Sequence, residues 1–427
     1  MKRIIVFLCA VAWLTACNDD KGEPWESGRV SRAVLIYMAG ENNLTKASNG
    51  HRYLQTDLNE IIKGSELLTD NQRLFVFLDS LVTNKDDAGK DGKGLPCIVE
   101  VHGGQTYVRY QFDHEFYSSD PAYFRQILQW MTSNAEADDY GLVLWGHACG
   151  WTVMTDTVAQ ARMATTRAYG EDDGKDMEGG SLKWMNITQM AKAMQGLPKL
   201  KFIFADCCNM ICAEVGHELR HVTDYLIGSP AEIPGDGAPY DRIVPYLYGN
   251  GSNLYRNIID TYYSYHLDDF KGDHTLDGYS VPLSVIDTKY MDQLASATHD
   301  ILGTFVPQKP DSPNLDNIAY YWHYDTPTMY DMKAVIKANA TEDDYNNWVK
   351  VYNQAVPYYR MSMKWMTIYS RLELNFNDFN QDESMYGCVS MFIPLNSYYY
   401  NYGDFKYNKT CTNMEWNRTM EWNRFGW

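Results

Sequence analysis

The chain has 427 residues, of which 45% are hydrophobic, so it can bury a large core. Its formal net charge of −18 argues against nucleic-acid binding, because too little basic surface is available to neutralise phosphates. Length alone would suggest two or three domains. However, no Pro/Ser/Gly-rich linker divides the chain beyond its N-terminal region, and we expect one globular domain over residues 31–427.

The N-terminus has the features of an export signal. Two basic residues precede an apolar stretch, residues 4–14, that is too short to span a bilayer as a mature helix. The stretch ends in Leu-Thr-Ala-Cys, which resembles the lipobox of bacterial lipoproteins. We therefore predict a signal peptide over residues 1–16, a lipid on Cys17 and a flexible tether over residues 17–30. A lipid anchor would hold the protein at the outer membrane or cell surface, since no other segment is expected to cross a membrane.

Four short apolar runs, rich in Val, Ile, Leu and Phe, predict strands. Because the runs are continuously apolar, each strand should be buried on both faces, as in a parallel sheet covered by helices. Helical patterns lie between them, and together they predict an α/β fold with a mostly parallel sheet sandwiched between helices. The strands are expected at residues 33–40, 73–80, 141–147 and 200–206, and the helices at 44–64, 121–134 and 186–197.

Three regions depart from this alternation. Residues 97–113 predict a β-hairpin that turns at Gly103 and Gly104. Residues 156–182 are polar, glycine-bearing and without period, so we expect a long exposed loop between two core strands. Beyond residue 240 the pattern becomes more helical.

Residues 205–221 carry motifs of two peptidase classes. His217, Glu218 and His221 spell H-E-x-x-H, the zinc-peptidase helix motif. A zinc site needs both histidines on the inward face of a helix, together with a third ligand. If a helix starts near Met210 and continues to Leu226, its apolar stripe, which includes Val222 and Leu226, faces the sheet and both histidines fall on the solvated side. No third ligand follows at a usual offset, so we expect a polar helix face and no metal site.

The second motif is a pair of cysteines at the end of a predicted strand. Cys207 and Cys208 would lie at the carboxyl edge of the sheet, where open α/β sheets bind ligands. A helix start just after them favours a thiolate. His147 ends another predicted strand and suits a general base. Neighbouring parallel strands would bring these ends together, although buried cysteines are often only small hydrophobic residues and a histidine can be structural.

Four segments, in this order and spacing, resemble the clostripain family of cysteine peptidases, relatives of caspases, legumains and gingipains. The resemblance extends from about residue 33 to the predicted strand at 386–394, and it implies a caspase-like fold. The segments are LIYMAGENNL, LWGHACGW, DCCNM and DYLIGSPAEIPGDGAPYD.

The resemblance assigns roles to single residues. His147 matches the catalytic histidine of the family. Asp206, Cys208 and Met210 match its D-x-C-x-M pattern, which makes Cys208 the nucleophile and puts Cys207 in the alanine position. The chain departs from the family where an alanine follows His147 in place of glycine and where the SPAEIPGDG stretch is less acidic, which bears on efficiency and preference.

The resemblance also implies a reaction. The peptide bond would be hydrolysed through a thioester, with the backbone N–H groups of Ala148 and Cys208 as oxyanion donors. The family cleaves after Arg or Lys, and Asp206 is the candidate carboxylate of the specificity pocket, with capping of the strand end as its structural alternative. The expected partner is a peptide or protein substrate with Arg or Lys at the cleaved bond.

Relatives in the family cut themselves between the two catalytic strands. The candidate self-cleavage residues in the loop at 156–182 are Arg162, Arg167 and Lys175, with the arginines favoured over the lysine; a passive surface loop is the alternative. The sequence indicates no cofactor and does not show whether calcium is required. A surface lipoprotein that binds peptide or glycan on an inactive peptidase fold is the competing function, and retention of His147 and Cys208 favours the enzyme.

Overall fold

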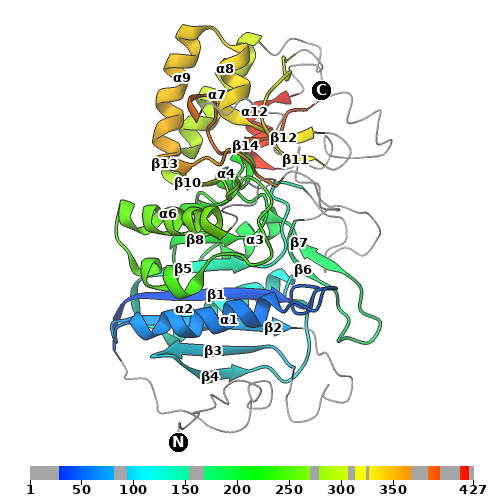
Figure 1. Cartoon of the computed structure of the whole chain (residues 1–427), viewed down its shortest axis with the longest axis vertical. Coiled ribbons are helices and arrows are strands. Elements are labelled where there is room, and N and C mark those ends of the chain that lie inside the picture. The colour runs from blue at the N-terminus through cyan, green and yellow to red at the C-terminus, as the bar shows by residue number, and fades with distance from the viewer. Residues whose placement is uncertain are drawn as a thin grey trace, which may run out of the picture.

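The computed structural model describes residues 28–80, 94–152, 168–269, 278–305, 313–323, 327–366, 383–394 and 414–422. A nine-stranded sheet forms its centre (Figure 1). From one edge to the other its strands are β13 (Tyr358–Arg360), β10 (Leu283–Asp287), β9 (Thr223–Gly228), β8 (Leu200–Asp206), β5 (Ala137–Trp145), β1 (Val30–Gly40), β2 (Gln72–Ser80), β3 (Cys97–His102) and β4 (Gln105–Gln111).

The five central strands of this sheet run parallel, and two antiparallel strands lie at each edge. All four runs that were predicted as strands from the sequence belong to the parallel part. The mixed α/β fold with a mostly parallel sheet is therefore confirmed. Two smaller sheets join β6 (Tyr169–Asp172) to β7 (Lys183–Met185), and β12 (Pro327–Asp331) to β11 (Tyr320–His323) and β14 (Ser390–Met391).

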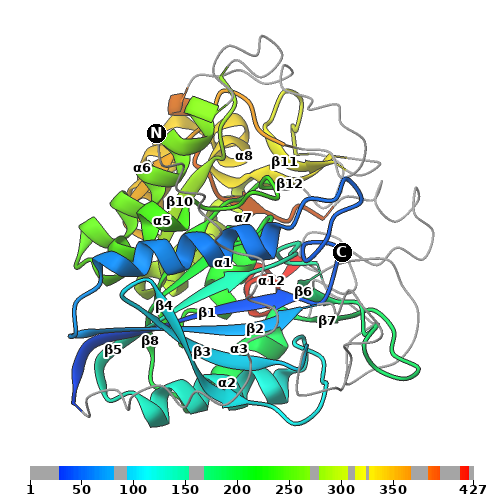
Figure 2. The ribbon, with the colours of Figure 1, turned by 60° about the horizontal axis from the view of Figure 1, so that its bottom comes forward.

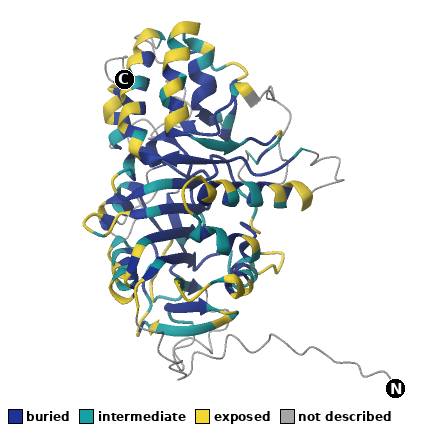
Figure 3. Cartoon of the chain, turned by 90° about the vertical axis from the view of Figure 1, so that its left-hand side faces the viewer, coloured by how far each residue is buried: buried dark blue, intermediate teal, exposed yellow. Residues whose placement is uncertain are grey.

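Helices cover both faces of the large sheet, and each face has its own core (Figures 2 and 3). In β1, Leu35 and Tyr37 belong to one core while Ile36 and Met38 belong to the other, which is why the run is continuously apolar. The helices on the first face include α2 (Pro121–Asn134), α3 (Ile187–Met194), α4 (Ala213–Glu218), α7 (Met291–Phe305), α8 (Met332–Asn339) and α9 (Glu342–Ala355); those on the second are α1 (Tyr53–Gly64), α5 (Tyr240–Ile243) and α6 (Ser252–Asp269).

Local signals in the sequence correctly marked two element boundaries. The Asp120 side chain accepts a hydrogen bond from the Ala122 N–H at 2.8 Å, and α2 begins at the proline that follows Asp120. The hairpin of β3 and β4 turns at Gly103 and Gly104, whose φ angles are +59° and +75°. Two successive residues with positive φ form the turn type whose twist matches the paired strands.

The H-E-x-x-H segment does not have the structure expected from its sequence. We expected a helix from about residue 210 with both histidines on its solvated face, but α4 ends at Glu218 and β9 begins only five residues later. His217 is buried, with its ring 5.8 Å from that of Trp416 in the C-terminal helix α12 (Glu415–Met420). His221 is exposed and lies outside the helix. Helix α12 covers His217, and the local sequence gave no sign of this distant segment.

The predicted loop at 156–182 is only partly irregular. Its first half falls outside the described residues, and Arg162 and Arg167 lie there. From residue 168 onward the chain is described, and β6 contains the fully buried Tyr169 and Asp172. The loop prediction was therefore wrong for β6, because two buried residues in a short two-stranded sheet leave almost no periodic signal.

The N-terminal predictions fall mostly outside the described residues, including the signal peptide and Cys17. The predicted tether, residues 17–30, ends one residue too late, because Val30 is the first residue of β1. Within the described part of the chain, no helix combines the length and apolar character needed to cross a bilayer.

Candidate active site

The candidate histidine and cysteine follow two adjacent strands of the sheet. β5 and β8 pair in parallel, and Trp145 lies opposite Asp206 at the end of the pairing. His147 and Cys208 each come two residues after these paired positions. Because the strands run in the same direction, both residues emerge at the carboxyl edge of the sheet. The predicted adjacency of the two strand ends is thus present in the fold.

The two turns beyond these strands also pack against each other. Asn209, directly after Cys208, has a φ of +59°, a left-handed conformation that asparagine tolerates better than most residues. Gly150, three residues after His147, has a φ of +54°. A Cβ added at Gly150 would lie 2.3 Å from the Asn209 carbonyl oxygen. Only glycine therefore permits this approach of the two turns.

The neighbouring cysteines have different surroundings. Cys207 is fully buried, and this burial raises the pKa of its thiol well above the usual value. Cys208 is half-buried, and its Sγ lies 3.5 Å from the Ile233 N–H nitrogen. Every other cysteine that the structure describes is buried. The exposure of Cys208 and the raised pKa of the buried Cys207 thiol both make Cys208 the better candidate for the reactive thiol of the pair.

Asn43 contacts the candidate histidine and was not recognised from the sequence. His147 Nε2 lies 2.7 Å from Asn43 Oδ1. An amide oxygen only accepts hydrogen bonds, so this contact places a proton on Nε2 and leaves Nδ1 as the basic nitrogen of the neutral ring. Asn43 lies just beyond the carboxyl end of β1, which is the neighbour of β5 in the sheet. That position at the same sheet edge is the signal that could have identified it.

The backbone around His147 pairs with the strand that follows the sequence-predicted loop. The Gly170 N–H donates to the His147 carbonyl at 2.9 Å, and the Cys149 N–H donates to the Ala168 carbonyl at 2.7 Å. Ala148 lies opposite residue 169 between these bonds. In such a pair the N–H of the central residue points away from the partner strand. The Ala148 N–H, a predicted oxyanion donor, is thus directed away from β6.

Asp206 is buried and held by three donors. The hydroxyls of Tyr240 and Tyr262 each donate to its carboxylate at 2.8 Å, and the Ala238 N–H donates at 3.1 Å. Burial raises the pKa of Asp206 above its ordinary value, although these hydrogen bonds act in the opposite direction. Asp206 is therefore a buried carboxylate whose charge is only partly compensated.

A second buried carboxyl group lies beside Asp206. Asp57, from α1, accepts a hydrogen bond from Trp145 Nε1 at 2.6 Å. Burial and then the charge of Asp206 raise the pKa of Asp57 to about 9, so Asp57 is neutral at pH 7. A Cβ at Gly237 would lie 2.9 Å from Asp206 Oδ2 and 3.4 Å from Asp57 Oδ2. Both carboxyl groups thus converge on Gly237, and no sequence pattern had indicated Asp57.

Of the self-cleavage candidates, the structure describes only Lys175. Its ammonium pairs with Asp173. The turn around it is hydrogen-bonded: the Asp176 N–H donates to Glu41 Oε1 at 3.1 Å, and the Gly174 N–H donates to Asp172 Oδ1 at 3.0 Å. Lys175 is therefore held in a compact turn, whereas a peptidase binds its substrate extended.

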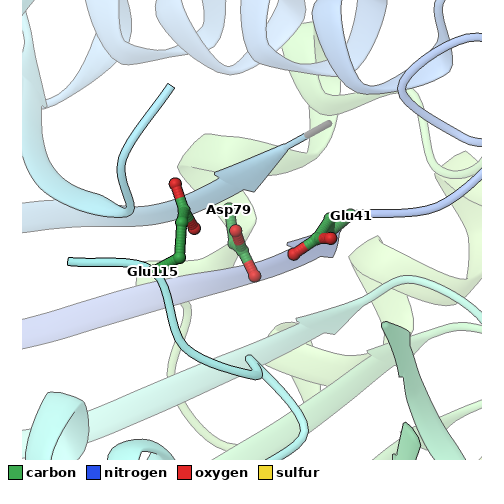
Figure 4. Close-up of side chains that lie close together, drawn as sticks. All are labelled: Glu41, Asp79 and Glu115. Carbon is green, nitrogen blue, oxygen red and sulfur yellow. The ribbon is translucent and has the colours of Figure 1, made fainter. Parts of the chain in front are cut away.

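Among the described residues, one group brings three metal-ligating side chains within 4.8 Å of one another, and it contains no histidine. It consists of the carboxylates of Glu41, Asp79 and Glu115, which point toward one another (Figure 4). His217 instead approaches Asp292, with 3.3 Å between Nε2 and Oδ1.

A mostly parallel sheet between two helical layers, with a thiol and an imidazole at the ends of adjacent strands, defines the class of caspase-like cysteine peptidases. The model of the clostripain family matches residues 36–427. The chain therefore belongs to the clostripain family and is a cysteine-type peptidase.

Solved structures agree with this assignment. A secreted C11 cysteine protease from Bacteroides thetaiotaomicron, solved with an irreversible peptide inhibitor, is 25% identical with a TM-score of 0.70, over 92% of this chain and 99% of that one. An inactive zymogen C11 protease from Parabacteroides distasonis shares the fold, with 22% identity and a TM-score of 0.70 over 92% and 99% of the two chains. A search of curated proteins found no match.

The packing of Gly150 against Asn209 gives a testable prediction. Gly150→Ala combines an unfavourable positive φ with a clash against backbone, so the two turns must separate, and we expect kcat/KM to fall by at least about tenfold. Gly196→Ala is the matched control, since its φ is +78° but nothing lies within 4 Å of an added Cβ. Peptidase assays and thermal unfolding of both variants test this. Equal activity of the two variants would contradict a role for the turn contact.

Proposed function

We propose that the protein is an exported, lipid-anchored endopeptidase that cleaves after Arg or Lys, with Cys208 as nucleophile and His147 as general base. The observation that carries this proposal is the half-buried Cys208 after β8, adjacent in the sheet to His147 after β5. The similar Bacteroides thetaiotaomicron protease is described as secreted, which agrees with export. Lipid attachment at Cys17 rests on the lipobox-like sequence alone.

The proposed reaction has two halves. His147 accepts the thiol proton as Cys208 Sγ attacks the carbonyl carbon, and it then donates that proton to the leaving amine as the thioester forms. Water, deprotonated by the same imidazole, attacks the thioester and releases the acid product and the thiol. The contact of His147 Nε2 with Asn43 supports Nδ1 as the nitrogen that exchanges the proton. The Ala148 and Cys208 N–H groups are the proposed donors to the oxyanion.

The proposed preference for Arg or Lys rests on Asp206. A basic side chain entering a low-dielectric pocket needs a paired anion, and Asp206 is a buried carboxylate two residues before the proposed nucleophile. Its tyrosine partners fix its position through both carboxylate oxygens. The neighbouring Asp57 would add a hydrogen-bonding group without adding a second charge at neutral pH.

We also propose self-processing in the region 156–182. Ala168, at the end of the segment that is not described, pairs with Cys149 beside His147. The residue that follows this segment therefore lies next to the proposed catalytic histidine. The hydrogen-bonded turn around Lys175 supports the arginines as the better candidates.

The assignment of the nucleophile is tested by two single substitutions. Cys208→Ala should reduce cleavage of fluorogenic Arg and Lys substrates by at least about 10³-fold, because it removes the thiol on which the thioester is proposed to form. Cys207→Ala, its neighbour in the sequence, should retain much of the activity. The measurement is kcat/KM, with circular dichroism as the folding check. If Cys207→Ala were inactive and Cys208→Ala active, the nucleophile would be Cys207 and not Cys208.

The proposed specificity is tested at Asp206. Asp206→Asn should lower kcat/KM for basic substrates by about 10²-fold or more, because it removes the charge that pairs with the substrate. The rate of Cys208 alkylation by a neutral reagent should remain near that of the parent. Asp331→Asn is the matched control, since Asp331 is also buried and held by a tyrosine hydroxyl and backbone N–H groups. An unchanged preference for basic substrates in Asp206→Asn would show that Asp206 is not the carboxylate that pairs with the substrate.

Self-processing predicts a new N-terminus. Purified full-length protein should, on incubation, be cut after Arg162 or Arg167 rather than Lys175, because Lys175 is held in its turn. N-terminal sequencing identifies the site, and the Cys208→Ala protein serves as the control. Full activity from a chain that stays intact would exclude activation by cleavage, and equal cutting of Cys208→Ala would indicate a contaminating protease.

A further inference from the structure

The loop that follows β9 is hydrogen-bonded to the turn that carries the proposed nucleophile. The Ile211 N–H donates to the Ser229 carbonyl at 3.0 Å, and the Asn209 N–H donates to the Ala231 carbonyl at 2.9 Å. Asn209 Nδ2 adds a bond of 2.9 Å to the Pro230 carbonyl. These residues are all buried, so their hydrogen bonds fix the position of the loop relative to the turn.

The next donor along this loop points at the thiol itself. Ile233 lies two residues beyond Ala231, and its N–H nitrogen is 3.5 Å from Cys208 Sγ. In the described part of the chain this N–H has no other acceptor. The preceding residue, Glu232, pairs with Met366 in an isolated antiparallel bridge. The backbone that carries the donor is therefore held in place on its N-terminal side.

This donor stands where a helix was expected. The sequence predicts a helix start just after the cysteine pair, and a helix start favours a thiolate. In the structure α4 begins at Ala213, five residues after Cys208, and is 6 residues long. The helix therefore does not begin at the proposed nucleophile, and the Ile233 N–H is the backbone donor that contacts its sulfur.

Most of the titratable groups around Cys208 are acids, which do not favour a further negative charge beside them. Among the described groups, His147 would become positively charged once it accepts the thiol proton. A thiolate in these surroundings therefore depends on neutral donors such as a backbone N–H. The groups are Asp206 and Cys207 at the end of β8, His147 beyond β5, Glu232 on the loop, Tyr262 on α6 and Tyr279 between α6 and β10.

We propose that the backbone N–H of Ile233 is a catalytic group that stabilises the thiolate of Cys208. A hydrogen bond to the charged form lowers the pKa of a thiol, so a larger fraction is nucleophilic at neutral pH. This role depends on Cys208 being the nucleophile, as proposed above, and adds a group to the same reaction. The loop also donates the Ala238 N–H to Asp206 at 3.1 Å, so one loop contacts both the thiol and the candidate specificity carboxylate.

The hydrogen bond has two opposing effects on the reactivity of the thiol. Lowering the thiol pKa by one unit gives about tenfold more thiolate at a pH below both values. The same shift makes each thiolate about threefold less reactive, because nucleophilicity falls with pKa at a Brønsted coefficient of about 0.4–0.5. The net effect is a gain of about threefold at neutral pH and a loss of about threefold at high pH, where the thiol is ionised in either case.

A proline substitution tests this role. Ile233→Pro removes the N–H, and the extended bridge at Glu232 suits a residue before proline. Ile233→Ala is the matched control, because it keeps the N–H and removes more of the side chain. The rate of Cys208 alkylation by iodoacetamide is followed by mass spectrometry from about pH 6 to about pH 10. Ile233→Pro should react about threefold more slowly than Ile233→Ala at neutral pH and about threefold faster at the high-pH plateau.

An ester bond covers the case in which Ile233→Pro does not fold. Replacing Ile233 by its α-hydroxy acid exchanges the N–H for oxygen and keeps the side chain, and its pH profile should cross that of the parent in the same way. Coincident profiles, or alkylation slowed by one factor at every pH, would overturn the role of Ile233.

The peptidase assay separates this role from the assignment of the nucleophile. Retained activity in Cys208→Ala would overturn Cys208 as the nucleophile, and the role of Ile233 with it. Coincident alkylation profiles beside an inactive Cys208→Ala would overturn the role of Ile233 alone.

Discussion

The parallel pairing of β5 with β8 is the constraint on which the rest of the site depends. It fixes Trp145 opposite Asp206, and this register determines where the chain leaves each strand. The turns that follow are then close enough for Gly150 to pack against the Asn209 carbonyl. A shift of the register by one residue would turn each side chain of β8 to the opposite face of the sheet. Asp206 would then leave its tyrosine partners, and Cys207 would take the place of Cys208.

The protein keeps several carboxyl groups buried, and it compensates them in different ways. Asp206 and Asp331 each accept hydrogen bonds from tyrosine hydroxyls and backbone N–H groups. Asp57 is held neutral by burial and by the neighbouring charge of Asp206. Burial and then the charges of Asp172 and Glu41 raise the pKa of Asp79 well above its ordinary value, so Asp79 resembles Asp57 in this respect. The contrast shows that burial of a carboxyl group does not by itself identify its role; the set of donors around it does.

The sequence predicted the sheet well because both of its faces are buried, which leaves continuous apolar runs. It also predicted that His147 and Cys208 share one edge, since parallel strands require it. It did not predict the surroundings of His217, because a helix about two hundred residues away covers that side chain. The segment after Glu218 was taken as helix because Val222 and Leu226 fit a helical spacing, yet Leu226 belongs to β9.

The residues missed around the site share one physical reason. Asn43, Asp57 and Asp79 acquire their partners only when distant strands and helices come together. Asn43 and Asp79 lie at or near the carboxyl ends of β1 and β2, and Glu41 lies at the same edge of the sheet. These positions could be inferred from the predicted strands. Acidic or amide residues just past a predicted parallel strand are therefore worth testing as site residues, even without a recognised motif.

The order of the strands has a consequence for how the molecule could be assembled. β5 precedes residue 153 and β8 follows residue 167, so a cut between those positions would leave the central pair of the sheet on two separate polypeptides. In the intact chain, bringing the strands together costs only the entropy of closing a loop. In the cut chain the same step is an encounter between two molecules, with a much larger entropic cost. Such an enzyme would fold once, as a precursor, and its working lifetime would be set by its rate of unfolding rather than by an equilibrium.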